Sequence, residues 1–109
     1  MTPKEFRKYL VRDKHCLHCG ADGDELIPQH RANKGSGGSK LRDVPSNIIV
    51  FCSEANFMAE ANAEFARLCR ARGWKLSSWH EPSAEPVFDA VAGVWWLLDD
   101  KFGRVSVQV

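Results

Sequence analysis

The sequence predicts a small α+β domain, with all 109 residues in a single domain. Two observations point to this class. Helix-like spacing of apolar residues, near the N-terminus and in the middle of the chain, alternates with short β-branched and aromatic segments. The chain is also short enough for its hydrophobic core to be thin, so a bound metal or a partner would help to stabilise it.

The first third of the chain predicts a helix, a turn and a strand. The stretch TPKE at 2–5 has a capping-box pattern with proline at the first helical position. The stretch HCLHCG at 15–20 has the composition of a tight turn. Residues Glu25 to His30 predict a short strand, which Pro28 confines to the edge of a sheet.

The middle of the chain predicts a loop, a strand and the longest helix. Residues 31–46 are polar and rich in Gly and Ser, so they predict an exposed loop, and the apolar NIIVFC at 47–52 predicts a strand. Residues from about 53 to 72 predict one continuous helix that ends at Gly73. The apolar face of that helix is expected to contain Phe57, Ala61, Phe65 and Leu68.

The last third predicts a loop and a terminal β-hairpin. Residues 74–86 carry two prolines and are loop-like, whereas VWWLLDD and RVSVQV flank a short turn at 101–103. Trp79, Trp95 and Trp96 can stack on nucleic-acid bases, but aromatic residues in such segments belong more often to the core. We therefore expect structural roles for them.

The sequence has no apolar run long enough to cross a bilayer and no signal-peptide pattern at its N-terminus, so we expect a soluble, cytoplasmic protein without a membrane partner. The net charge of +1 hides a segregation of charges. Four cations and no acid lie between Arg31 and Arg42, whereas residues 76–100 carry five carboxylates and no Lys or Arg. A polyanionic partner is therefore compatible with the near-neutral total.

Several polar residues follow one another at characteristic spacings. In chain order they are Cys16-x-x-Cys19, Gln29-His30, a Gly-rich basic loop, Asn47, Cys52 and Asn56. This order resembles the HNH endonuclease family, and especially its small members from phages of actinobacteria. The resemblance covers about residues 14–74. It implies a ββα-metal core (the HNH or His-Me finger), preceded by the N-terminal helix, with a C-terminal extension over about 75–109.

The resemblance assigns catalytic roles to His30, Asn47 and Asn56. His30 matches the general base that deprotonates the attacking water, and an imidazole suits this role because its pKa lies near working pH. Asn47 matches the residue that orients the histidine through the backbone. Without the motif, His30 would more often be a surface residue and Asn47 a turn residue.

The resemblance places a catalytic Mg²⁺ or Mn²⁺ ion at Gln29, Asn56 and Glu60. The last two stand at i and i+4 of the expected helix, so their side chains can converge on one ion, and oxygen ligands suit these hard cations. Helix capping by Asn56 and surface solvation of Glu60 are equally good interpretations.

A structural zinc site is incomplete in the sequence. Cys16, Cys19 and Cys52 match three zinc ligands, but Ala55 stands where a second C-x-x-C pair would end. Cys69 would lie roughly 20 Å along a continuous helix and is better explained as a buried thiol. His15 or water can complete the site, and we expect it to be zinc-free or partly occupied because a three-thiolate site is open to water and to oxidation.

The glycine-rich loop carries Arg31, Lys34, Lys40 and Arg42, and exposed N–H groups with cations suit a phosphodiester backbone. A flexible linker has a similar composition. The function we expect is a metal-dependent DNA endonuclease or nickase. The alternatives are a catalytically degenerate HNH fold that binds nucleic acid or protein, and a phage accessory protein that binds a host protein through its acidic C-terminal half.

Overall fold

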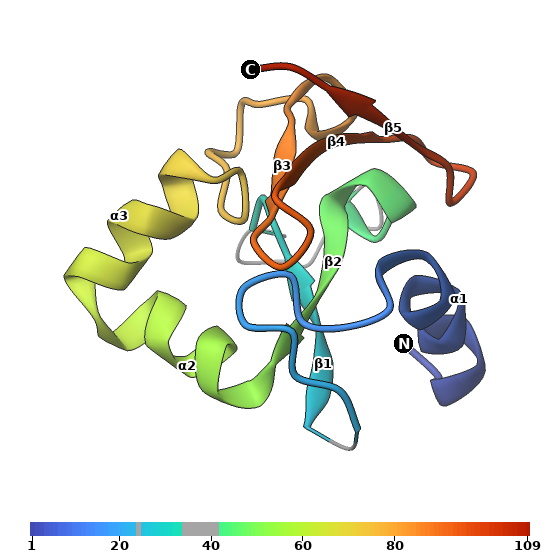
Figure 1. Ribbon diagram of the computed structural model, residues 1–109, viewed down its shortest axis with the longest axis horizontal. Helices are drawn as coiled ribbons and strands as arrows, with labels where there is room; N and C mark the ends of the chain where they lie inside the picture. The colour runs from blue at the N-terminus through green and yellow to red at the C-terminus, as the bar shows by residue number, and fades with distance from the viewer. Residues whose placement is uncertain (24, 34–41) are drawn as a thin grey trace.

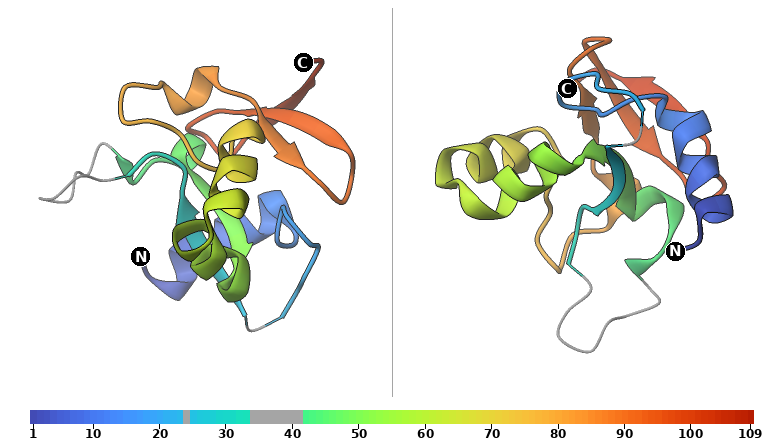
Figure 2. Two further views of the ribbon diagram at one scale, coloured as in Figure 1. Left: turned by 90° about the vertical axis from the view of Figure 1, so that its left-hand side faces the viewer. Right: turned by 90° about the horizontal axis from the view of Figure 1, so that it is seen from below.

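The computed structural model describes residues 1–23, 25–33 and 42–109. Three helices and two antiparallel sheets make up an α+β fold, as the sequence predicts. A two-stranded sheet lies at the centre, with α1 on one side, α2 and α3 on the other, and the three-stranded sheet across one end (Figure 1). The perpendicular views in Figure 2 keep the same arrangement of helices around the central hairpin.

Helix α1 (Pro3–Asp13) begins at the predicted capping box. The hydroxyl of Thr2 accepts from the backbone N–H of Glu5 at 3.1 Å, and the Glu5 carboxylate accepts from the backbone N–H of Thr2. The two side chains therefore satisfy backbone N–H groups that have no partner within the helix.

The last turn of α1 is fastened to the central hairpin by a buried ion pair. Nε of Arg12 donates to Asp13 at 2.7 Å, and both side chains are almost completely buried. Arg12 also donates to the carbonyl of Ile48 at 2.6 Å, while Asp13 accepts from the backbone N–H of Val50 at 3.0 Å. The pair thus satisfies backbone groups of the neighbouring strand, as buried charges require.

Strands β1 (Leu26–His30) and β2 (Ile48–Cys52) form the antiparallel central hairpin. The pairing joins Leu26 to Cys52 at one end and His30 to Ile48 at the other. A two-stranded sheet has only edge strands, which explains why it tolerates Pro28. All five residues of β2 are buried because helices cover both faces of the hairpin.

Helix α2 (Ser53–Ala61) follows β2 directly, and α3 (Ala63–Ala71) begins two residues later, so the prediction of one continuous helix is wrong. Asn62 between them is extended, with φ −120° and ψ 118°. Its backbone N–H closes α2 on Met58, and its side-chain oxygen accepts from the backbone N–H of Phe65 at 2.8 Å. Asparagine is among the best residues for such a cap, and here it starts a new helix.

The break also changes which face of the helical segment is buried. Phe57, expected in the core, is 67 % exposed, and Ala61 is exposed as well. The residues that pack inward are Ala55, Ala59, Phe65, Leu68 and Cys69. A second helix with a new axis presents a face that the periodicity of a single helix does not predict.

The C-terminal sheet contains β3 (Val87–Asp89), β4 (Val94–Leu98) and β5 (Arg104–Val107) in that order. The β4–β5 hairpin confirms the prediction, whereas the short β3 was not predicted. Two 3-10 turns, η2 (Pro45–Asn47) and η3 (Pro82–Ala84), precede β2 and β3.

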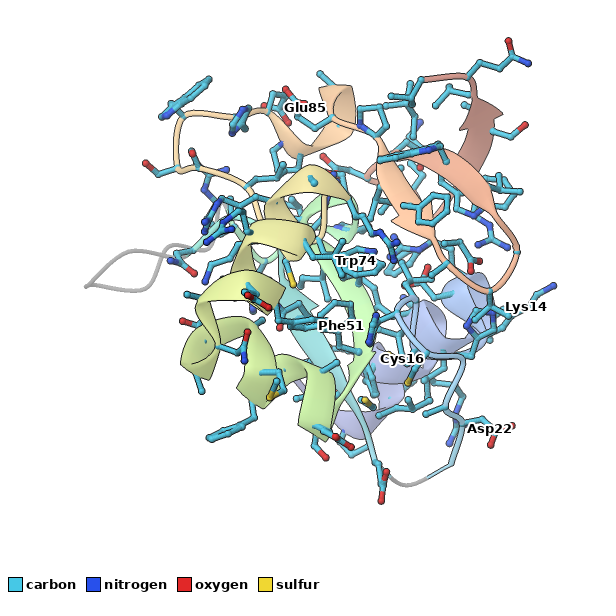
Figure 3. The ribbon with its side chains drawn as sticks, turned by 60° about the vertical axis from the view of Figure 1, so that its left-hand side comes forward. Lys14, Cys16, Asp22, Phe51, Trp74 and Glu85 are labelled. Carbon is cyan, nitrogen blue, oxygen red and sulfur yellow. The ribbon has the colours of Figure 1, made fainter. Side chains whose placement is uncertain are left out.

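The main core lies between the central hairpin, the helices and the C-terminal sheet. Phe51 and Trp74 are fully buried there, with their ring centroids 5.4 Å apart (Figure 3). Gly73 precedes Trp74 with φ +75°, and a Cβ at this position would lie 2.0 Å from the carbonyl oxygen of Pro86. Trp79 differs from expectation, because it is 79 % exposed and stacks on the ring of His80. Within the described ranges, no helix has the length and apolar character needed to span a membrane.

Candidate functional site

Three cysteine side chains converge at one end of the central hairpin. Cys16 and Cys19 lie in the turn after α1, and Cys52 is the last residue of β2. Their three sulfur atoms lie within 4.8 Å of one another, and the sulfurs of Cys19 and Cys52 are 3.8 Å apart. Cys16 and Cys52 are buried, whereas Cys19 is exposed. These three residues, named the cysteine cluster below, can bind a metal ion such as zinc.

The backbone around the cysteine cluster provides hydrogen-bond donors to its sulfur atoms. The backbone N–H of Ala55 donates to the sulfur of Cys52 at 3.3 Å. Burial raises the pKa of the Cys16 thiol to about 11, while the nearby backbone N–H groups of Cys19, Cys52 and His18 act in the opposite direction. A divalent cation at the cluster compensates for the buried negative charge, so the residues present fit a thiophilic metal.

Neither His15 nor Cys69 belongs to the cysteine cluster. Nδ1 of His15 donates to the carbonyl of Cys16 at 2.9 Å, and its Nε2 lies 3.9 Å from Asp89. Cys69 is a buried thiol outside the cluster, as expected, and burial raises its pKa to about 11. His15 therefore makes other contacts, and neither His15 nor Cys69 is placed to be the fourth ligand of a closed zinc site.

His30 lies at the opposite end of the hairpin, beside an aspartate. Nε2 of His30 lies 2.7 Å from Oδ1 of Asp43, and because an ionised carboxylate only accepts, the imidazole is the donor. Both side chains line a cavity of about 380 Å³ together with Glu5, Lys8 and Tyr9 of α1. His30 therefore has a carboxylate on one ring nitrogen and faces an open space.

The neighbouring residue Gln29 points to the other face of the hairpin, as alternation along a strand requires. It is only 4 % exposed, and the side-chain amide of Asn56 on α2 donates to its Oε1. Glu60, the third expected ligand, is paired with Nζ of Lys75 at 3.2 Å. The structure thus joins two of the three residues expected at the catalytic ion and directs the third to a lysine.

Asn47 is fully buried and holds the two ends of the glycine-rich loop together. Its Oδ1 accepts from the backbone N–H of Ala32 at 2.8 Å, and its amide donates to the carbonyls of Ala32 and Arg42. Its own carbonyl accepts from the backbone N–H of Arg31 at 2.8 Å. Asn47 therefore fixes the backbone directly after His30, so it is more than a plain turn residue.

Arg31 is buried, whereas the sequence predicts an exposed cation that contacts DNA. The residue is 0 % exposed, and among the described residues its guanidinium donates to five backbone carbonyls. These belong to Ser46, Gly73, Pro82, Glu85 and Pro86. Burial lowers the pKa of Arg31 to about 10, so it stays charged at neutral pH. The side chain is an anchor that joins the end of β1 to the segment before β3.

The other loop cations have different outcomes. Arg42 is half-buried and donates to the carbonyls of Ser78 and His80. Lys34 and Lys40 lie outside the described residues, so their expected contacts with DNA stay predictions.

Sequence reasoning missed Asp43, the partner of His30, and Lys75, the partner of Glu60. Asp43 stands 13 positions after His30, and Lys75 stands 15 positions after Glu60. Opposite charges at such separations carry no periodic signal, so only the folded chain reveals these pairs.

Neither a model of a known protein family nor a curated protein nor a solved structure matches the chain.

Proposed function

We propose that the chain is a metal-dependent DNA endonuclease or nickase that hydrolyses phosphodiester bonds at the His30 end of the β1–β2 hairpin. The contact between Gln29 and Asn56 carries the proposal. These residues stand 27 positions apart, and the resemblance to HNH endonucleases names both as ligands of one ion. The order β1, β2, α2 that brings them together is also the order that a ββα-metal core requires.

His30 acts as the general base in this proposal, and Asp43 positions it. A carboxylate that accepts from Nε2–H favours the tautomer in which Nδ1 is free of a proton and can take one from water. Asn47 supports the same end of the strand by fixing the backbone at residue 32. Hydrogen bonds thus fix both the side chain of His30 and the backbone that follows it.

A divalent cation such as Mg²⁺ or Mn²⁺ supplies stabilisation of the negative charge that develops on the phosphate and the leaving oxygen. Amide oxygens of Gln29 and Asn56, with the carboxylate of Glu60, would hold it. In the observed state Glu60 pairs with Lys75, and its side chain is 68 % exposed, so it is free to exchange partners. With only one carboxylate in the set, a phosphate oxygen of DNA is needed to complete the coordination.

The proposal assigns phosphate contacts to Lys34, Lys40 and Arg42 and none to Arg31. Contacts of this kind are electrostatic and independent of sequence, so they weaken as salt rises. The proposed place of action is the cytoplasm of a bacterial cell, on phage or host DNA.

A second function, binding of nucleic acid or protein without cleavage, is favoured by one observation. The Asn56 amide donates to Oε1 of Gln29, and the Glu60 carboxylate pairs with Lys75, so groups of the proposed ion site already have partners within the protein. Such pairing is expected in a fold that has lost its catalytic metal. Both functions permit DNA binding, so only cleavage separates them.

The experiment is relaxation of supercoiled plasmid by the purified protein with Mg²⁺, with Mn²⁺ and with EDTA. A nuclease converts the plasmid to the nicked or linear form with either ion and does not cleave it in the presence of EDTA. DNA binding in a gel-shift assay without any cleavage would replace the proposal by the binding function.

A further inference from the structure

We propose that the cysteine cluster is an open metal centre. Its three thiolates hold one thiophilic ion, and the fourth coordination position exchanges with ligands from solution, such as water or a small thiol. Closed four-ligand sites serve structure, whereas sites with three protein ligands keep an ion available to an incoming molecule.

The sulfur positions suit one tetrahedral ion. Sulfurs bound to a common zinc at about 2.3 Å stand about 3.8 Å from each other. Cys19 and Cys52 have this separation, and Cys16 completes a group in which every distance is within 4.8 Å. The turn at Cys16 is fixed by a hydrogen bond of 2.9 Å from the backbone N–H of Gly20 to the carbonyl of Cys16.

In a second C-x-x-C pair the fourth thiolate would come from position 55, where this chain has Ala55. This residue lies in the first turn of α2, three positions after Cys52, and its N–H already bonds the Cys52 sulfur. Ala55, Cys19 and Cys52 together line a pocket of about 220 Å³. A methyl group and open space therefore occupy the position from which a fourth thiolate would reach the ion.

The other polar residues near the cluster do not close it. His18 also lines the pocket, with its ring edge-on against Phe65 and Trp74 and its buried Nδ1 without a hydrogen-bond partner among the described residues, but it lies outside the group of sulfurs that meet within 4.8 Å. Glu54 lines the pocket from an exposed position. Among the His, Cys, Asp and Glu residues that the structure describes, only the three cysteines meet within ligand distance.

The pocket also gives an incoming ligand access to the ion. Cys19 is the exposed member of the cluster and faces the pocket, whose other walls include Met58 and Phe65. A small ligand with one soft donor atom and little polar surface matches walls of this kind, so a small thiol is the probe of choice.

The test is Co²⁺ binding to the reduced apoprotein, prepared without thiol reductant under anaerobic conditions, followed by titration with 2-mercaptoethanol. Cobalt reports its thiolates through charge-transfer absorption. We expect one Co²⁺ per chain with three thiolates, and the exogenous thiol should raise the charge-transfer intensity by about one third as a fourth thiolate enters.

Two Ala→Cys variants of the same helix sharpen the test. Ala55→Cys should show the four-thiolate spectrum without added thiol and should no longer respond to 2-mercaptoethanol. Ala61→Cys, which adds an exposed thiol in the last turn of α2, should behave like the wild type.

A wild-type spectrum that ignores 2-mercaptoethanol would show that the chain itself supplies the fourth ligand and would overturn the proposal. Failure of the wild type to bind Co²⁺ or Zn²⁺ at all would overturn it too. Both readings come from the wild-type protein, so they stand even where Ala55→Cys does not fold. They also require no nuclease activity.

Discussion

The two ends of the central hairpin arrange their functional side chains in different ways. At the Cys52 end, three identical side chains from a turn and a strand end converge on one point. At the His30 end, adjacent side chains diverge, with His30 facing Asp43 and α1, and Gln29 facing Asn56 on α2. The first end suits a soft cation. The His30 end has two separate polar pairs, His30 with Asp43 and Gln29 with Asn56. Only a substrate or an ion that spans the end of the strand would contact both pairs.

The largest expected effect comes from removing the anchor of the His30 end. Arg31→Met leaves five backbone carbonyls without their buried donor, so it should destabilise the protein by about 3–5 kcal/mol. Urea unfolding followed by circular dichroism measures the change. Arg67→Met, at an exposed position of α3, is the control and should change stability by less than about 0.5 kcal/mol. Equal stability of the two variants would contradict the anchoring role.

The second effect concerns the Cys52 end. An ion present at a hundred times its dissociation constant stabilises the fold by about 2.7 kcal/mol, which corresponds to roughly 10 °C in melting temperature for a chain of this size. We therefore expect zinc to raise the melting temperature of the reduced protein and a chelator to reverse the change. Cys16→Ser should abolish the response. A melting temperature indifferent to zinc in the wild type would contradict metal binding at the cysteine cluster.

A smaller effect is expected from removing the carboxylate that contacts the side chain of His30. Asp43→Asn removes the carboxylate that fixes the imidazole tautomer, so nicking should fall by about tenfold, the lower range for loss of an outer positioning group. Nitrogen-15 NMR of His30 should show a smaller share of the Nε2–H form at the same time. Asp22→Asn, at an exposed position, is the matched control. A tautomer that is the same in both variants would remove the positioning role from Asp43.

The smallest expected effect lies between α2 and α3. Asn62→Ala removes the cap on Phe65 and should cost about 1 kcal/mol of stability. Asn33→Ala, at an exposed position, should change the urea midpoint much less. A gain in stability for Asn62→Ala would mean that one continuous helix is the better structure for this segment.

The difference between the two ends also explains what the sequence could predict. Cys16 and Cys19 share one local turn, and α1 begins at a local capping box, so short-range spacing was sufficient for both. The burial of Arg31 depends on carbonyls 15 to 55 positions away, and Asp43 stands 13 positions after its partner His30. Patterns of neighbouring residues do not contain such information.

The break at Asn62 is an intermediate case. Asparagine followed by Glu64 in the next turn is a local start signal for a helix, but the apolar spacing on both sides of it fits a single helix. The capping signal at Asn62 therefore outweighs the periodicity of the apolar residues around it. Strand β3, with three residues, is too short to give any alternation, and its pairing with β4 reveals it only in the fold.

The measurement that tests the proposed function most directly is the rate of plasmid nicking in Mn²⁺ by the wild type, His30→Ala and His80→Ala. His80 is the matched control because it undergoes the same substitution in the loop before η3, where its ring stacks on Trp79. We predict that His30→Ala keeps the fold and loses at least about a hundredfold in rate, the scale of a general base, while His80→Ala stays close to the wild type. Equal rates for a folded His30→Ala and the wild type would contradict catalysis by the His30 end.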